Sequence, residues 1–428
     1  TAVLLGDLNA VAPVVTMFFL TVYGMVNIVA ALETLSGDTS WRPRIRVPWM
    51  LSLLGGVACF AVMFLINPIA AVGAVVVEIL LWIYLARREK TAAWGDVRRG
   101  VYEALIRWSL IKLSHRPLTA RNWRPHVLVF VDNVEKRLDL IRYGTWFSQG
   151  RGVVTVCELK VADLLEERIS VRDEELRVQR TPDREGLPAF GEVAIVGDLI
   201  GGMVTVAQAN GMAGLDSNTM LLGWPRDPER LLHFLKVVKR LNRVNKSAMI
   251  ARIQPGLVPR PWEERHIHVW WGGLQRNGDL MLLLAHLLTR NPEWGNAEIT
   301  ILSVASNEHM KASTEKYLAD LLPQVRIAAH SDVMILPKAK TIREIIHERS
   351  ATADIVFLGL DVPEQHEDQI KYAQRITELS EPLRTVFFVK NSSLFVGQLI
   401  KSADEASVAE TPAPPPEARS PKPEPAGS

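Results

Sequence analysis

Small and acidic residues follow three apolar segments that the sequence predicts as β-strands, and each junction has residues suited to holding a phosphate group. Gly197, Asp198, Gly201 and Gly202 follow residues 192–196, Asp132 follows residues 126–131, and Gly272, Gly273 and Gly278 follow residues 266–271. A strand that turns directly into a helix presents backbone N–H groups at the helix N-terminus, and these groups bind anions. None of the three junctions has the spacing of a known nucleotide fingerprint. Each is therefore a candidate nucleotide crevice, with an ordinary tight turn as the alternative.

The other chemistry-bearing residues form no recognisable catalytic motif. His266 and His268 alternate within one apolar segment and so face the same side of a strand, as two zinc ligands would, but the sequence offers no evident third ligand. The sequence lacks GxSxG, HExxH and GxxxxGK[ST] patterns, and no GxGxxG follows a strand. We therefore expect no enzymatic activity and no metal site.

One carboxylate, Glu78, interrupts an otherwise uncharged run at residues 69–86. Ionisable groups inside a membrane are functional candidates, so Glu78 is a candidate for coupling or transport. The alternative is that Glu78, which lies about two helical turns from the end of the run, reaches water there.

The composition divides the chain into a membrane part and a water-soluble part. The 428 residues are 48% hydrophobic, with a formal net charge of +2 and two cysteines, which argues against nucleic-acid binding and against a disulfide scaffold. Only seven charged residues lie between positions 1 and 86. Because the chain begins at Thr1 with no readable signal peptide, we expect it to be the C-terminal fragment of a longer protein.

Three apolar runs, residues 10–32, 49–66 and 69–86, are long enough to cross a bilayer. Arginines occupy the loop before the second run, and Arg87, Arg88 and Lys90 follow the third. By the positive-inside rule both segments belong on the cytoplasmic side. The sequence thus predicts a multi-pass protein in contact with membrane lipid, with its C-terminal domain in the cytoplasm.

The rest of the chain predicts an α/β fold. Residues 87–122 contain an amphipathic connector helix, residues 123–253 a first α/β lobe, 254–265 a Pro-rich joint, 266–400 a second lobe, and 401–428 a disordered Pro/Glu/Ala tail. Strands alternate with helices, which favours mainly parallel sheets covered on both faces. The predicted strands are 126–131, 153–159, 192–196, 219–223, 247–253, 266–271, 298–304, 325–329, 354–360 and 384–389.

Several stretches of the sequence resemble a known transporter family. They are GDLNAVAPVVTMFF (6–19), WRPRIRVPW (41–49), TAAWGDVRRG (91–100), NWRPHVLVF (122–130), SNTMLLGW (217–224) and residues 267–304, beginning IHVWWGGLQRNGDL. Together they are similar to the cation–chloride cotransporters, the sodium–potassium–chloride and potassium–chloride cotransporters of the amino acid–polyamine–organocation superfamily. The resemblance covers about residues 1–395.

The resemblance implies the C-terminal part of a compact, prokaryotic member: the last three membrane helices, then two universal-stress-protein-like lobes. Such proteins move chloride with potassium and/or sodium, electroneutrally, by alternating access, and form homodimers through their last membrane helices and cytoplasmic domain. The positions matching the outer vestibule are Ala12 and Thr16, whereas the main ion sites lie earlier in the chain. In some relatives the lobes hold a nucleotide. No cofactor is expected here, with a regulatory adenine nucleotide as the alternative that the resemblance leaves open. Because residues 305–340 are short, regulation through a phosphorylated insertion is not expected.

Two alternatives stay open from the sequence. One is an amino-acid permease-like transporter that carries a stress-protein-like domain. The other is a membrane-anchored nucleotide-sensing domain.

Overall fold

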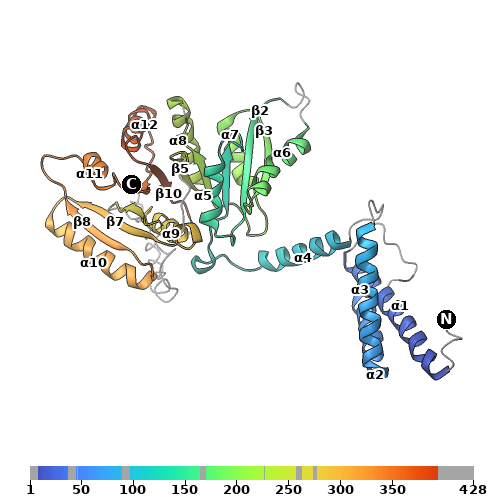
Figure 1. Cartoon of the computed structure of the whole chain (residues 1–428). Helices are drawn as coiled ribbons and strands as arrows, with labels where there is room; N and C mark the ends of the chain where they lie inside the picture. The colour runs from blue at the N-terminus through green and yellow to red at the C-terminus, as the bar shows by residue number, and fades with distance from the viewer. Residues whose placement is uncertain are drawn as a thin grey trace, which may run out of the picture. The chain divides into compact units, whose positions relative to one another are not determined.

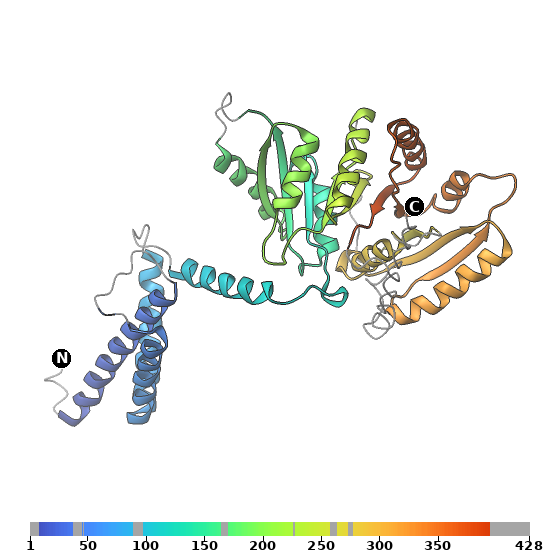
Figure 2. The same ribbon diagram turned by 180° about the vertical axis from the view of Figure 1, so that it is seen from behind.

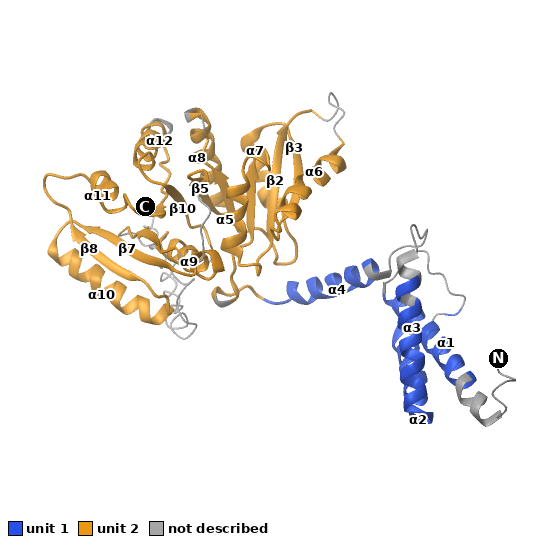
Figure 3. Ribbon diagram, in the orientation of Figure 1, with its two compact units in different colours: residues 1–116 blue, residues 117–428 orange. Residues whose placement is uncertain are grey.

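The computed structural model describes residues 8–36, 45, 47–88, 97–163, 170–225, 227–256, 263–272 and 277–393. The chain forms two compact units, Thr1–Arg116 and Pro117–Ser428 (Figure 3). The predicted tail at 401–428, the middle of the predicted Pro-rich joint, and Gly273 lie outside the described residues.

Within its described residues, the first unit has four helices. They are α1 (Leu8–Ser36), α2 (Trp49–Ile66), α3 (Pro68–Arg88) and α4 (Val97–Ser114). Asn67 separates α2 from α3, and its side-chain oxygen accepts hydrogen bonds from the backbone N–H groups of Ile69 and Ala70, both at 3.1 Å. An Asn cap followed by Pro at the first helical position starts a new helix at once. The second and third predicted helices therefore form a hairpin.

Two of these helices are long and apolar enough to cross a membrane, over Val15–Leu35 and Trp49–Ile66. The third predicted span, 69–86, is helical, but its apolar stretch covers only Pro68–Leu81. A third membrane crossing therefore stays a prediction.

Close approach of backbones holds α1 against α2. A Cβ atom at Gly56 would lie 2.7 Å from Cγ1 of Ile28 and 3.1 Å from the carbonyl oxygen of Gly24. Without hydrophobic attraction in lipid, helices associate through close packing at small residues, and Gly24 and Gly56 provide that contact.

The second unit is built on one ten-stranded sheet with the order β3-β2-β1-β4-β5-β10-β9-β6-β7-β8 (Figure 1). Its strands are β1 (Val127–Val131), β2 (Val154–Val161), β3 (Phe190–Val196), β4 (Thr219–Gly223), β5 (Ser247–Arg252), β6 (Arg265–Trp270), β7 (Ala297–Ala305), β8 (His330–Ile335), β9 (Ile355–Gly359) and β10 (Thr385–Lys390). Every pairing is parallel except β5 with β10, where Phe388 lies opposite Ile250. The two predicted lobes are therefore halves of one continuous sheet, joined at this antiparallel pair.

Helices cover both faces of the sheet, and the two views show them in front and behind (Figures 1 and 2). The helices are α5 (Leu138–Ser148), α6 (Val171–Arg184), α7 (Leu199–Ala209), α8 (Pro228–Arg243), α9 (Gly278–Thr289), α10 (Glu308–Val325), α11 (Ile342–Arg349) and α12 (His366–Ser380). Buried residues of α5, α6, α9 and α10 belong to one hydrophobic cluster and those of α7, α8, α11 and α12 to another. The fold is thus a mainly parallel α/β sheet between two helical layers, as the sequence predicts.

The predicted strand at 325–329 is wrong. Helix α10 continues to Val325, Arg326 follows with a left-handed φ of 53°, and the strand begins only at His330. Strand β8 lies at the edge of the sheet, where polar residues such as Ser331 and Asp332 face water. An edge strand of this kind lacks the apolar run by which a buried parallel strand is found.

Candidate functional site

A cavity of about 690 Å³ opens at the carboxyl ends of β6, β9 and β10. Its lining comes from these strands, from β7, and from helices α9 and α11. The residues are Trp270, Trp271, Gly272, Asn277, Gly278, Met281, Val304, Ile342, Ile346, Leu358, Gly359, Asp361 and Lys390. Small-molecule sites usually measure about 300–1,000 Å³ and have mostly apolar walls, which this cavity matches.

The topology explains why the cavity lies here. The chain leaves β6 for β7 on one side, whereas β9 pairs with β6 on the other. Connections therefore diverge between β6 and β9, and this switch point of an open parallel sheet is where ligands bind.

Two glycines shape the cavity. At Gly278, the first residue of α9, a Cβ atom would lie 2.7 Å from the ring of Trp271, so only glycine lets this indole cover the helix start. At Gly359, which is exposed, a Cβ atom would lie 3.2 Å from Nδ2 of Asn277. Gly278 thus lets Trp271 pack against the start of α9, and Gly359 lines the cavity without a side chain that would occupy it.

Three polar side chains face this region. Lys390, at the end of β10, pairs with Asp361 at 2.9 Å, and its side chain is 21% exposed against 83% for Asp361. Asn277 donates from Nδ2 to the carbonyl of Leu360 (3.1 Å) and accepts at Oδ1 from the N–H of Asn391 (2.8 Å). The N-cap of α9 therefore holds together the residues that follow β9 and β10. The arrangement suits a flat, largely apolar ligand with an anionic group near Lys390.

A buried hydrogen-bonded cluster lies beside this wall. Ser350 accepts from Nε1 of Trp270 at 3.0 Å and lies 2.9 Å from Nδ1 of His268. Burial, with weaker repulsion from nearby positive charge, lowers the pKa of His268 to about 4. His268 is therefore neutral at physiological pH and fixes the ring of Trp270 through Ser350.

His266 and His268 gain no further metal ligands from the fold. Within the described ranges, no three His, Cys, Asp or Glu residues come close enough together to hold a metal ion.

The structure separates the other predicted site residues from this cavity. Asp132, after β1, is paired with Arg137 at 2.9 Å. Partial burial alone would raise the pKa of Asp132, but the hydrogen bond and charge of Arg137 outweigh it and leave the pKa below its ordinary value. Asp198 is the N-cap of α7 and accepts from the N–H of Gly201 at 2.7 Å, beside Gly197 near the β3 edge. Of the glycines predicted for a nucleotide, Gly272 and Gly278 line the cavity among the described residues.

The predicted membrane residues lie in the first unit. Ala12 belongs to α1, although its side chain is not described. Thr16 is on the exposed side of α1 and Glu78 is half-buried on α3.

Sequence reasoning missed Lys390, Asp361 and Asn277. Lys390 and Asp361 each come at or just after the end of a predicted strand, so the carboxyl ends of neighbouring strands carried the available signal. Without the strand order, nothing in the sequence places β6, β9 and β10 side by side.

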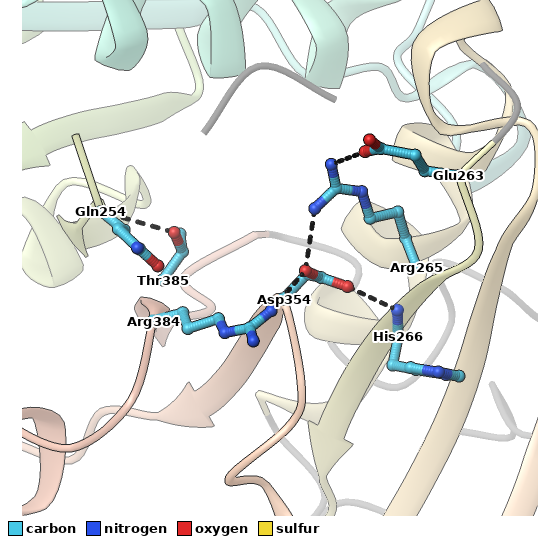
Figure 4. A network of polar contacts seen from close by, with 7 residues as sticks. All are labelled: Gln254, Glu263, Arg265, His266, Asp354, Arg384 and Thr385. Atoms are coloured by element: carbon cyan, nitrogen blue, oxygen red, sulfur yellow. Dashed lines mark hydrogen bonds and ion pairs between the residues drawn. The ribbon is translucent and has the colours of Figure 1, made fainter. Parts of the chain in front are cut away.

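At the opposite, amino ends of the same three strands lies a buried ionic network (Figure 4). Asp354 accepts at Oδ1 from Arg265 (2.9 Å) and Arg384 (3.1 Å), and at Oδ2 from the N–H of His266 (3.0 Å). Glu263 also pairs with Arg265, and the N–H of Gln254 donates to Thr385 at 3.3 Å. One carboxylate thereby ties the starts of β6, β9 and β10 together, which fixes the relative position of their far ends at the cavity.

Comparison with known proteins finds a family match within the α/β unit. Residues 260–341, which run from before β6 to the start of α11, match the family model of solute carrier family 12. Trp270, Trp271 and Asn277 of the cavity wall lie within this segment.

Solved structures with similar folds cover the α/β part. The cytoplasmic domain of a prokaryotic cation chloride cotransporter is 17% identical, with a TM-score of 0.48, over 65% of this chain and 99% of that chain. A universal stress protein from Archaeoglobus fulgidus is 14% identical, with a TM-score of 0.42, over 63% of this chain and 97% of that chain. At these identities and TM-scores, neither similarity says what this chain binds.

Proposed function

We propose, because residues 260–341 match the family model of solute carrier family 12, that this chain is the C-terminal part of a secondary-active cation–chloride cotransporter. The whole protein carries chloride inward or outward with potassium and/or sodium, electroneutrally, by alternating access. The α/β unit is its cytoplasmic regulatory and dimerisation domain. The observation that carries the proposal is the family match within a chain that also contains two apolar, membrane-length helices.

The first unit supports a membrane location. Side chains such as Phe18 (68% exposed) and Leu65 (83% exposed) cover the outside of the α1–α2 pair, where water would be an unfavourable neighbour. The arginine-containing segments flanking the apolar runs support the multi-pass topology with a cytoplasmic C-terminal domain. On this proposal Ala12 and Thr16 are positions of the outer vestibule, and Glu78 lies within the third span.

Ion flux tests the proposal. The protein that contains this chain is reconstituted into liposomes, and uptake of potassium and of sodium is measured with chloride outside or with gluconate in its place. We expect cation uptake to require chloride and to be unaffected by membrane potential, because the cycle moves no net charge. Chloride-independent uptake of amino acids would instead support the permease-like alternative.

Light scattering of the detergent-solubilised protein tests the dimer. A mass of two protomers, without the detergent, is the expected result. A monomer at every concentration contradicts the dimerisation part of the proposal and leaves the flux test unaffected.

The cavity favours a second function, binding of a regulatory adenine nucleotide by the α/β unit. Its apolar walls suit a base, Lys390 suits a phosphate, and the N-terminus of α9 at Gly278 adds backbone N–H groups. Calorimetry with ATP, ADP and AMP tests this binding. We expect Lys390→Met to weaken it about tenfold, since the ionic contact is lost. Lys371→Met, which changes an exposed lysine of α12, is the matched control. No heat with any of the three nucleotides contradicts this function.

A further inference from the structure

The two halves of the sheet have the same internal order. Each half is read here from its edge strand toward the centre of the sheet. The first half then runs β3-β2-β1-β4-β5, and the second runs β8-β7-β6-β9-β10. Each half therefore has a switch point between its first and fourth strands, at β1/β4 and at β6/β9. Since ligands bind at such points, the topology by itself offers two equivalent crevices.

In each half, corresponding residues meet at this point. The N-cap of the helix after the first strand is Arg137 in the first half and Asn277 in the second. The glycine that ends the fourth strand is Gly223 in the first half and Gly359 in the second. In both halves the N-cap side chain lies against this glycine. The two sites can therefore be compared residue by residue.

The second site is open. The side chain of Asn277 is short and is held by Leu360 and Asn391, and Gly359 is exposed. Among the described residues, no heavy atom lies within 4 Å of a Cβ position built at Gly272. The cavity of about 690 Å³ occupies the resulting space.

The first site is covered by the chain itself. The guanidinium of Arg137 reaches across Gly223, where a Cβ atom would lie 3.5 Å from Nη1, and Gly223 is half-buried. Nε of Arg137 donates to Asp132 at 2.9 Å, so the residue after β1 holds the guanidinium in place. The guanidinium of Arg137, 30% exposed and ion-paired, therefore lies over the glycine at this switch point.

We infer that the two switch points have diverged, with Arg137 and Asp132 closing the first from within and the second left open as the ligand site of the α/β unit. The inference that the open site takes a nucleotide rests on the proposed function. The difference in access between the halves does not, and it can be measured without any ligand.

Thiol reactivity measures this access directly. Gly223→Cys and Gly359→Cys are made separately in the full chain, and modification by N-ethylmaleimide is followed by mass spectrometry of the peptide concerned, which separates it from Cys59 and Cys157. We expect the thiol at position 359 to react at least about tenfold faster than the thiol at 223, because reaction requires access. Equal rates in folded protein overturn the inference.

Removal of the occluding side chain provides the second step. Adding Arg137→Asn to Gly223→Cys is expected to raise the rate at position 223 about tenfold, toward that at 359. Arg142→Asn, on the same helix and paired with Glu185 at 3.0 Å, is the matched control and should leave the rate unchanged. Circular dichroism establishes that each variant is folded. A folded Arg137→Asn protein with no faster reaction at 223 refutes closure by Arg137.

Placing the residues of the first switch point at the second one tests ligand binding, with ADP as the probe. Gly272→Asp with Asn277→Arg places the ion pair of the first half in the second, and we expect at least about a tenfold loss of ADP affinity and slower thiol reaction at 359. Asn277→Ala removes the same hydrogen bonds without filling the cavity, and should retain ADP binding better than the exchange variant. Two ADP molecules bound per wild-type chain overturn the inference. Absence of ADP binding contradicts only the nucleotide proposal, since the thiol rates still decide whether the first site is closed.

Discussion

His268 makes the stability of the folded chain depend on pH. The unfolded chain protonates this imidazole below about pH 6.5, whereas burial delays protonation in the folded chain to about pH 4. Between these values the unfolded state binds more protons, so stability falls as the pH falls from about 6.5 to 4. The change attributable to His268 is at most about 3 kcal/mol. Thermal unfolding from pH 7 to pH 4.5, compared with His268→Asn, measures it.

A histidine remote from this cluster provides the control for this measurement. His309→Asn alters an exposed ring on α10 and should keep the acid sensitivity of the wild-type chain. If His268→Asn loses stability in acid as steeply as the wild type, the imidazole is not the group responsible.

Individual site residues were the least predictable feature of the sequence. Glycine or aspartate after a strand is a signal that many tight turns share. Gly278 makes room for Trp271, whereas Asp198 caps α7. Lys390 lies 112 positions beyond Gly278 in the chain, and only the strand order places both at one cavity. The sequence identified individual strand–helix turns, whereas the cavity depends on which of these turns lie side by side in the sheet.

At the scale of the elements, Asp354 is expected to control the stability of β6, β9 and β10. Its side chain is 5% exposed and serves two arginines, so Asp354→Asn leaves buried Arg265 with Glu263 as its remaining carboxylate partner and removes the charge that Arg384 pairs with. Removing one member of a buried ionic network costs about 3–5 kcal/mol. Urea unfolding of the variant measures the loss.

An exposed pair shows whether burial is the reason. Asp332→Asn breaks the ion pair between Asp332, 44% exposed, and Arg349, 47% exposed. It should lower the free energy of unfolding by less than about 1 kcal/mol. Similar losses for the two variants would mean that the Asp354 network contributes no more than a surface ion pair.

The α1–α2 pair depends on the close approach at Gly56. Gly56→Leu drives a side chain into Ile28 and the backbone of Gly24, and we expect it to destabilise the pair by about 1–3 kcal/mol. Heating the protein in detergent with a thiol-reactive dye reports helix separation through Cys59, which lies against Gly24. Gly73→Leu, at a position with open space, should leave the transition temperature nearly unchanged. Equal shifts for both variants would contradict close packing at Gly56.

At the scale of the whole molecule, composition and periodicity were sufficient for the class of fold. Apolar runs such as residues 126–131 predicted buried parallel strands, and the resemblance to cation–chloride cotransporters is confirmed by the family match at 260–341. The joining of the two half-sheets through the antiparallel β5–β10 pair could not be predicted in this way. Strands β5 and β10 are as apolar as other central strands, and nothing in an apolar pattern specifies whether the neighbour belongs to the same half or runs antiparallel.

This union predicts that the two halves unfold together. Phe387 of β10 lies 5.0 Å from the ring of Tyr143 and 5.3 Å from that of Phe147, both on α5 of the first half. Phe387→Ala is therefore expected to cost about 3–5 kcal/mol and to weaken both halves, because the lost contacts belong to a core they share. Hydrogen exchange of β1 amides, far from the substitution in the chain, measures the effect on the first half.

Exchange at β1 distinguishes one cooperative domain from two lobes in contact. In one domain, amides of β1 and β7 that exchange only by global unfolding lose equal protection in Phe387→Ala. Ile370→Ala, which changes a side chain 40% exposed on α12, should leave both strands as protected as in the wild type. Protection that falls in β7 but persists in β1 would show that each half keeps its own stability and that the β5–β10 pairing only docks them.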